Sequence, residues 1–149
     1  MPLTKDAGFD AAVLDREDLP VALIQVKAQP LGKEWTPMLR NQLETYRKHL
    51  PNADFLLAVD PACMHLYRLH GIDLDGPIVH FDTPQVLSHY EPEFGKKRIF
   101  ERYVLTLVEA WLRDLAYHWK SAKPPGSDEL AAVGFLAKVE GGTTQPPWM

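Results

Sequence analysis

Cysteine is nearly absent from this chain, because Cys63 is the single cysteine among its 149 residues. One thiol cannot form a disulfide within the chain, and it cannot supply a cysteine-based metal site. Proteins without disulfides are typical of reducing compartments, so we expect a cytoplasmic location.

The sequence also lacks long hydrophobic runs. No apolar stretch approaches the roughly 18 residues that a membrane-spanning helix needs. The N-terminal residues MPLTKDAGFD do not show the basic segment followed by an apolar one that marks a signal peptide. We therefore expect no membrane partner.

Basic residues are in the minority, with 16 Lys and Arg against 20 Asp and Glu, and the formal net charge is -4. This balance argues against the broadly basic surface of proteins that coat nucleic acids. A local basic cleft stays open, because electrostatic steering depends on where the charges lie. The length and the 46% hydrophobic content suit one domain with a sizeable core.

The order of predicted elements is that of an α/β protein. Runs of β-branched and aliphatic residues indicate strands, while Thr-Pro pairs before residues 38 and 85 are typical helix starts, with Thr36 as an N-cap. The expected strands cover residues 8–14, 21–28, 54–60, 64–69 and 76–82, and the expected helices run from Pro37 to about Leu50, briefly from Pro84, and over 96–120. This order predicts a mixed central sheet flanked by helices and not a doubly wound repeat.

The predicted long helix over 96–120 is apolar on more than one side, and its main stripe includes Trp111 and Trp119. Such a helix is usually buried on more than one side, so it could cover the sheet and also form a homodimer. We assign residues 1–123 to one α/β domain that includes this helix. Residues 124–149 are rich in Pro and Gly, and we expect a loosely attached tail in which Leu130–Val139 docks as a helix or strand.

The stretch ALIQVKAQP, residues 22–30, places two polar groups in a predicted buried strand. Side chains alternate along a strand, so Gln25 and Lys27 share one face. If residues 15–20 form the hairpin turn, Leu14 pairs with Val21 and Asp10 lies opposite Gln25, on the same side. A carboxylate, an amide and an ammonium would then gather at one sheet edge.

Structural roles for these groups remain open. Asp10 and Lys27 could form an ion pair across two strands, although buried pairs contribute little to stability. Gln25 could satisfy backbone groups at a sheet edge. On the following helix, Gln42 and Tyr46 are four residues apart and share a face, which is also common in ordinary helices.

Taken in order, Asp10, Gln25-Val26-Lys27 and Gln42-x-x-x-Tyr46 resemble the motifs of the PD-(D/E)XK nuclease superfamily, which has the restriction-endonuclease-like fold. The stretch FDAAVLDREDLPVALIQVKAQ is similar to the N-terminal nuclease domain of type I restriction enzyme R subunits. The resemblance covers about residues 8–70.

The chain departs from the pattern of that family in two respects. Gln25 stands where the family usually has Glu or Asp, although some restriction-type members carry Gln. The family core usually has a helix and a strand before the Asp strand, and only seven residues precede Gly8 here. The long C-terminal helix could fill that space, a partner chain could fill it, or the domain is trimmed.

The resemblance implies a metal-dependent endonuclease that acts on DNA. In that reading Asp10, the Gln25 side-chain oxygen and the Val26 carbonyl hold Mg²⁺, and Lys27 orients the attacking water. Gln42 and Tyr46 would support the site or contact the DNA backbone. The missing charge at Gln25 should weaken metal binding, so that Mn²⁺ could be needed in place of Mg²⁺.

Two other functions stay open. The chain could be a catalytically inactive domain of this fold that serves as a nucleic-acid-binding or assembly module. It could also be an unrelated small α/β domain that dimerises through its long helix, with an accidental motif.

Overall fold

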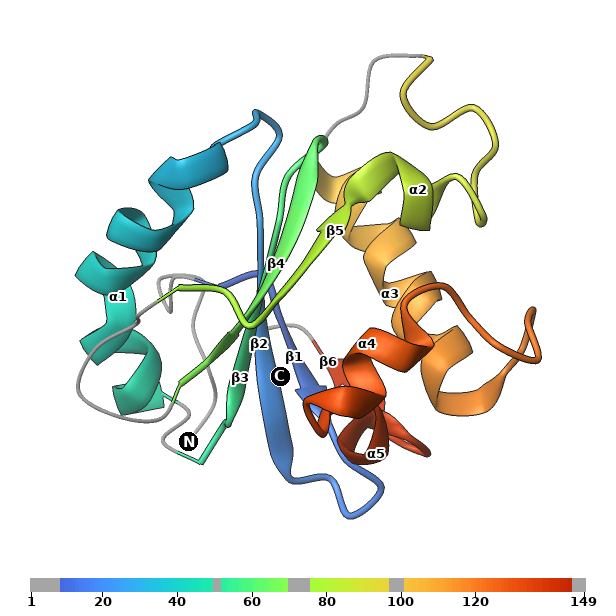
Figure 1. Ribbon diagram of the computed structural model, residues 1–149. Coiled ribbons are helices and arrows are strands. Elements are labelled where there is room, and N and C mark those ends of the chain that lie inside the picture. The colour runs from blue at the N-terminus through green and yellow to red at the C-terminus, as the bar shows by residue number, and fades with distance from the viewer. Residues whose placement is uncertain (1–8, 50–51, 70–75, 97–100, 146–149) are drawn as a thin grey trace.

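One mixed sheet of six strands forms the centre of the protein (Figure 1). The computed structural model describes residues 9–49, 52–69, 76–96 and 101–145. The strands are β1 (Ala11–Leu14), β2 (Pro20–Val26), β3 (Phe55–Val59), β4 (Cys63–Arg68), β5 (Val79–Asp82) and β6 (Thr143–Gln145). The strand order is β5-β4-β3-β2-β1-β6, in which β2 and β3 run parallel and the other neighbours run antiparallel. The prediction of an α/β protein with a mixed sheet is confirmed.

Helices cover both faces of this sheet. They are the 3-10 helix η2 (Gly32–Glu34), α1 (Trp35–His49), α2 (Thr83–Leu87), α3 (Glu101–Tyr117), α4 (Ser127–Ala132) and α5 (Phe135–Val139). Figure 1 shows α1 on one side of the sheet and α2 to α5 on the other. Within the described residues, no helix has the length and hydrophobicity needed to cross a membrane.

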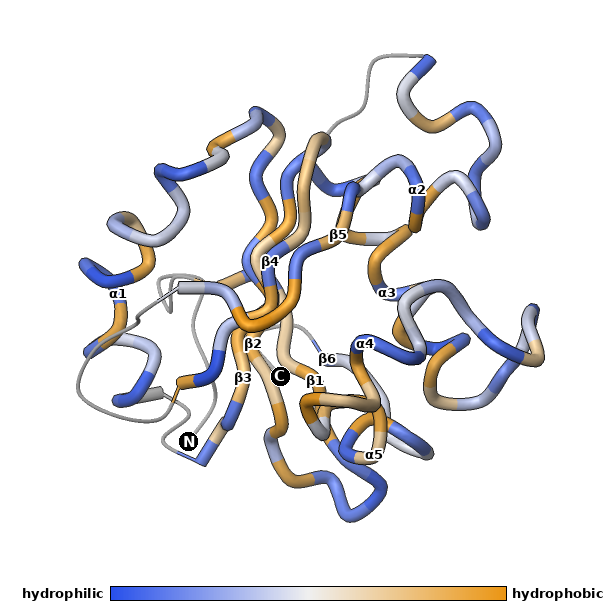
Figure 2. Tube along the Cα trace, viewed as in Figure 1, coloured by the Kyte–Doolittle hydropathy of each residue, from blue (hydrophilic) through white to orange (hydrophobic). Residues whose placement is uncertain are grey.

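Two hydrophobic clusters fill the spaces between the sheet and its two helical layers. Alternation along β2 sends Leu23 into the cluster under α1 and sends Ala22 and Ile24 into the cluster under α3. Every residue of β3 is buried, as its continuous apolar run predicts for a strand covered on both faces. Figure 2 shows the corresponding hydrophobic colouring along the central strands.

The hairpin of β1 and β2 has the predicted register over most of its length. Ala11 pairs with Ile24, Ala12 with Leu23 and Val13 with Ala22. The predicted pairing of Leu14 with Val21 is wrong, because the register shifts after Val13 and Leu14 pairs with Pro20. The shift lies beside the turn, where the Asp15 carboxylate accepts hydrogen bonds from the N–H groups of Glu17 and Leu19. The other end of the hairpin keeps the expected alignment.

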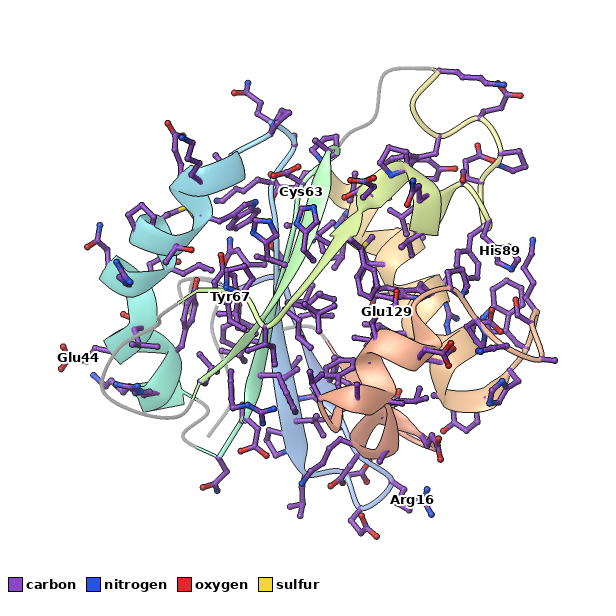
Figure 3. All side chains as sticks on the ribbon, in the orientation of Figure 1. Arg16, Glu44, Cys63, Tyr67, His89 and Glu129 are labelled. Carbon is purple, nitrogen blue, oxygen red and sulfur yellow. The ribbon has the colours of Figure 1, made fainter. Side chains whose placement is uncertain are left out.

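Helix α1 begins before its predicted N-cap. Thr36 lies inside the first turn, and its hydroxyl is 3.0 Å from the Tyr67 hydroxyl across the α1 layer. Figure 3 shows Tyr67 directed from the sheet toward α1, whereas Glu44 points outward from that helix. The 3-10 helix η2 leads directly into α1 at Trp35. The Trp35 indole Nε1 donates to the Asp60 carboxylate over 2.7 Å, a tertiary contact that local sequence rules do not include.

Helix α3 is shorter than predicted. It ends at Tyr117, and Lys96 lies in a turn, while the predicted start over residues 97–100 lies outside the described residues. At its C-terminal end the chain leaves the helix at His118, which has a φ of 55°. The buried Asp114 carboxylate accepts the N–H groups of Lys120 and Ser121, which turns the chain back. Trp119 therefore lies outside the helix and is 55% exposed, contrary to the prediction that places it on the buried stripe.

The segment after residue 123 is not a loose tail. Leu130, Phe135 and Val139 are buried in the same cluster as α3, and β6 pairs with β1. The prediction that Leu130–Val139 docks is confirmed, since it contributes to α4 and α5. A Cβ on Gly142 would lie 2.0 Å from the Leu14 carbonyl oxygen, so glycine permits the approach of this segment to β1.

Asp60, at the end of β3, connects three parts of the fold. Its fully buried carboxylate accepts hydrogen bonds from the N–H groups of Leu31, Ala62 and Cys63 and from the Trp35 indole, over 2.7 to 3.0 Å. Its backbone oxygen accepts the Thr83 hydroxyl at 2.7 Å. The same residue therefore holds the β3–β4 turn, the start of α1 and the start of α2.

Asp60→Asn should lower the free energy of unfolding by about 3 kcal/mol at neutral pH, because an amide NH₂ would face N–H donors in a buried site. Urea denaturation measures this loss. Asp82→Asn is the matched control, since the Asp82 side chain is 58% exposed and its removal should change little. Equal stability of the two variants would contradict the role assigned to Asp60.

The difference between wild type and Asp60→Asn should also depend on pH. Burial by itself raises the pKa of Asp60, but its backbone and indole donors outweigh burial and hold that pKa below the ordinary value. A lowered pKa in the folded state stabilises the fold above the pKa of the unfolded chain, and this contribution disappears as the pH falls through the folded pKa. The stability difference should therefore shrink below about pH 4.

Candidate active site

Asp10 lies in a bend directly before β1 and contacts the backbone of β2. Its N–H donates to the Ile24 carbonyl over 2.7 Å, and its carboxylate Oδ2 accepts the Val26 N–H over 2.7 Å. The carboxylate thus takes the place of a backbone acceptor just before β1 begins. This bond joins Asp10 to the segment that carries Gln25 and Lys27. The sequence predicts that Asp10 lies beside this segment.

Gln25 and the Gln42-x-x-x-Tyr46 pair also come together. Gln25 is 5% exposed and Tyr46 is fully buried. The Tyr46 hydroxyl lies 3.1 Å from the Gln25 Oε1, and it also donates to the Gln42 Oε1. Spacing by four residues places both α1 side chains on the same face, and the burial of Leu39, Leu43 and Tyr46 holds that face toward the sheet.

The phenol of Tyr46 carries one proton, although two amide oxygens face it. Only one of those oxygens can accept that proton at a time. A half-turn of the other amide would present its NH₂ group to the phenol oxygen, which can accept it. If Gln25 makes this half-turn, its oxygen is directed away from Tyr46 and is available to another partner.

Lys27 follows β2 directly, and its N–H donates to the Val59 carbonyl over 2.9 Å. It is half-buried and close enough to lower the pKa of Asp10 electrostatically. Among the described residues, however, Asp10 and Lys27 form no ion pair with each other. Asp10 and Lys27 thus interact electrostatically at this sheet end, and the alternative of a closed ion pair between them is not found.

Glu101 is a further carboxylate at this sheet end, and local sequence patterns do not identify it. It is the first residue of α3, far from Asp10 in the chain. Burial raises the pKa of Glu101, the Asp10 charge raises it further, and Lys27 opposes both. The two carboxylates and the ammonium therefore share one electrostatic environment.

Without a bound cation, the protein disfavours negative charge at this site. Burial raises the pKa of Asp10, and the Val26 N–H and Lys27 only partly oppose it. Burial and the Asp10 charge also raise the pKa of the Tyr46 hydroxyl. A divalent cation beside these oxygens would reverse the effect on the carboxylates, because a bound metal is the largest local charge in such a site.

The oxygen atoms at this site are of the kind that binds a hard cation, although they are few. Carboxylate, amide and backbone oxygens are the ligands that Mg²⁺ takes, and it usually keeps several waters as well. Asp10, Gln25, the Val26 carbonyl and Glu101 supply such oxygens. In the described part of the chain, no group of three or more His, Cys, Asp or Glu side chains is arranged to hold a metal ion.

Comparison with known proteins identifies no similar protein. No protein-family model, curated protein or solved structure matches this chain. The case for a function therefore rests on the chemistry of Asp10, Gln25, Lys27 and Glu101 and on the arrangement of the strands and helices that carry them.

Asp10→Asn should raise the free energy of unfolding at pH 7 by up to about 1 kcal/mol, because it removes a charge that burial disfavours and keeps an acceptor for the Val26 N–H. The cost of a raised carboxyl pKa is present above the folded pKa and vanishes below the unfolded one. The gain should therefore disappear near pH 3. Urea denaturation at both pH values without metal measures it.

Asp128→Asn is the control for this experiment. Asp128 pairs with Lys123 at 2.8 Å, but both side chains are exposed, so the variant should be nearly neutral. A loss of stability in Asp10→Asn at pH 7 would indicate that Asp10 forms a stabilising ion pair, and it would contradict the view that this carboxylate is kept for binding.

Proposed function

We propose that this protein is a metal-dependent endonuclease-like domain that hydrolyses phosphodiester bonds of DNA. The observation that carries the proposal is the bond between the Asp10 carboxylate and the Val26 N–H. It joins an acidic side chain to the strand segment with Gln25 and Lys27, in the order that resembles the PD-(D/E)XK nucleases. Tyr46, in the position of the helix motif, contacts Gln25 from the next element.

The arrangement of the strands bears on one departure from the family, the missing helix and strand before Asp10. The family usually places a helix and a strand before the Asp strand. Here β6 pairs with β1 on the edge opposite β2, and α3 packs on the same sheet with Glu101 near Asp10. This packing of α3 on the sheet supports the first of the three explanations raised by the sequence, in which the C-terminal helix fills the space of the missing elements.

Each residue has a physical task in this proposal. Asp10, the Gln25 oxygen and the Val26 carbonyl would hold Mg²⁺ or Mn²⁺, with Glu101 as a further acidic group. The metal, when bound, supplies a water of lowered pKa and neutralises charge on the scissile phosphate. The Lys27 ammonium orients the attacking water and stabilises the charge that develops on the phosphate oxygens.

Tyr46 and Gln42 act as supports in this proposal. Tyr46 is fully buried, so contact with the DNA backbone is not the role we assign to it. Its phenol instead fixes the Gln25 amide, and acceptance of the Gln25 NH₂ group would leave the Gln25 oxygen for the metal. Gln42 takes the phenol proton in that arrangement.

A catalytically inactive domain is the second candidate. Gln25 lacks the charge of the usual carboxylate, and the described acidic side chains form no complete metal-binding group. Such a domain could still bind nucleic acid or assemble with a partner. The homodimer through α3 has less support, because Val104, Leu107, Val108 and Leu115 of its apolar stripe are already buried against the sheet.

Plasmid cleavage with Mg²⁺ or Mn²⁺ tests the first candidate. Asp10→Ala and Lys27→Ala should each reduce cleavage by about 100-fold or more, since each removes a group that acts on the phosphate or its metal. Asp82→Ala and Lys123→Ala are matched controls in charge and size, and both side chains are exposed. Cleavage that survives both site substitutions would reject the assigned site.

Gln25→Glu should strengthen metal binding, because it places a second negative charge beside Asp10. We expect roughly tenfold tighter binding of Mg²⁺ by calorimetry. Gln85→Glu is the control, since it adds the same charge on an exposed side chain of α2. If neither the wild type nor Gln25→Glu gives heat of binding and neither cleaves, the inactive-domain candidate gains.

A further inference from the structure

Two large aromatic side chains are exposed where α3 ends. Tyr117 is 59% exposed and Trp119 is 55% exposed, whereas Trp111 on the same segment is fully buried. Together with Ala110 and Arg113 they line a hollow of about 370 Å³. The site of Asp10 does not use this hollow, which lies at the opposite end of α3 from Glu101.

Both rings are held in place by their polar atoms. The Trp119 Nε1 donates to the Ala110 carbonyl and the Tyr117 hydroxyl donates to the Gly141 carbonyl, each over 2.9 Å. The segment beyond α3 is also fixed, since the His89 Nε2 lies 2.6 Å from the Ser121 hydroxyl. Prearranged rings lose little conformational freedom when a ligand binds, so this hollow is suited to stacking.

A positively charged side chain lines the hollow, although the formal net charge of the whole chain is -4. Arg113 lines it and forms no hydrogen bond or ion pair with any described residue. Of the carboxylates nearest in sequence, Asp114 is buried and holds backbone N–H groups, and Glu109 accepts the Thr144 hydroxyl. An exposed guanidinium beside aromatic rings favours a ligand that combines a flat ring with an anion.

The size of the hollow favours a small group over a protein surface. Stable protein interfaces bury about 800 Å² on each partner. The apolar stripe of α3 is already used by the sheet, so the exposed part offers only the two rings and their surroundings. A nucleobase has the flat shape that stacks on Trp and Tyr, and its phosphate suits Arg113.

We propose that this hollow binds a base of single-stranded DNA, stacked on Trp119 and Tyr117, with the adjacent phosphate held by Arg113. The choice of a nucleic acid rests on the proposed function, and the inference adds single strands as the substrate class. Helix α3 separates the hollow from Glu101 by roughly 25 Å. A single strand that occupies both the hollow and the site with Asp10 has to span at least this distance.

The test measures binding of a labelled oligothymidylate by fluorescence anisotropy, with Asp10→Ala protein in EDTA so that no cleavage occurs. Removal of the Trp119 ring in Trp119→Ala should weaken binding by about tenfold, and Trp119→Phe should restore most of it. Arg113→Gln should weaken binding and reduce its salt dependence. Leu19→Ala is the control, since Leu19 is 60% exposed but lies in the β1–β2 turn.

Three outcomes would overturn this inference. An abasic phosphodiester of equal length that binds as tightly as oligothymidylate would exclude stacking. Absence of oligonucleotide binding would exclude the site. A concentration-dependent dimer that Trp119→Ala abolishes, without oligonucleotide binding, would assign the hollow to a second copy of the chain. Binding that stays intact while the metal-loaded wild type fails to cleave would reject the nuclease proposal alone.

Discussion

The buried carboxylate of Asp60 is the interaction on which the arrangement of the site depends. Its four N–H donors fix the β3–β4 turn and, through Leu31 and Trp35, the point at which α1 begins. The helical period places Trp35, Leu39, Leu43 and Tyr46 on one face of α1, and all four are buried in the same cluster. By holding Trp35, Asp60 anchors one end of the buried face of α1 that also carries Tyr46.

The sheet end joins two layers that the chain builds from distant segments. One layer provides Tyr46 behind β2, and the other provides Glu101 at the start of α3. Asp10 lies between them and is bound to the β2 backbone. Burial raises the pKa of Asp10, and burial and the Asp10 charge raise the pKa of Glu101. Carboxylates with raised pKa values cost stability at neutral pH, which is the expected signature of groups kept for binding.

Local rules predicted most strands and helices because those signals act over a few residues. Alternation in β2 and the length of the turn gave the register from Ala11 to Val13, and spacing by four gave the Gln42 and Tyr46 pair. The same rules failed where a distant partner decided the outcome. Asp60 binds the Trp35 indole at the start of α1, Asp114 binds the backbone that turns back after α3, and β1 pairs with the segment after Gly142.

The sequence by itself determined the elements, the two-sided burial of β3 and the polar order Asp10, Gln25, Lys27, since these depend on side-chain type and strand or helix period. Tertiary structure alone decided that Glu101 joins Asp10, that β6 completes the sheet beside β1, and that Trp119 is exposed. Such contacts join residues far apart in the chain, and their energies depend on packing and burial, which no local pattern encodes.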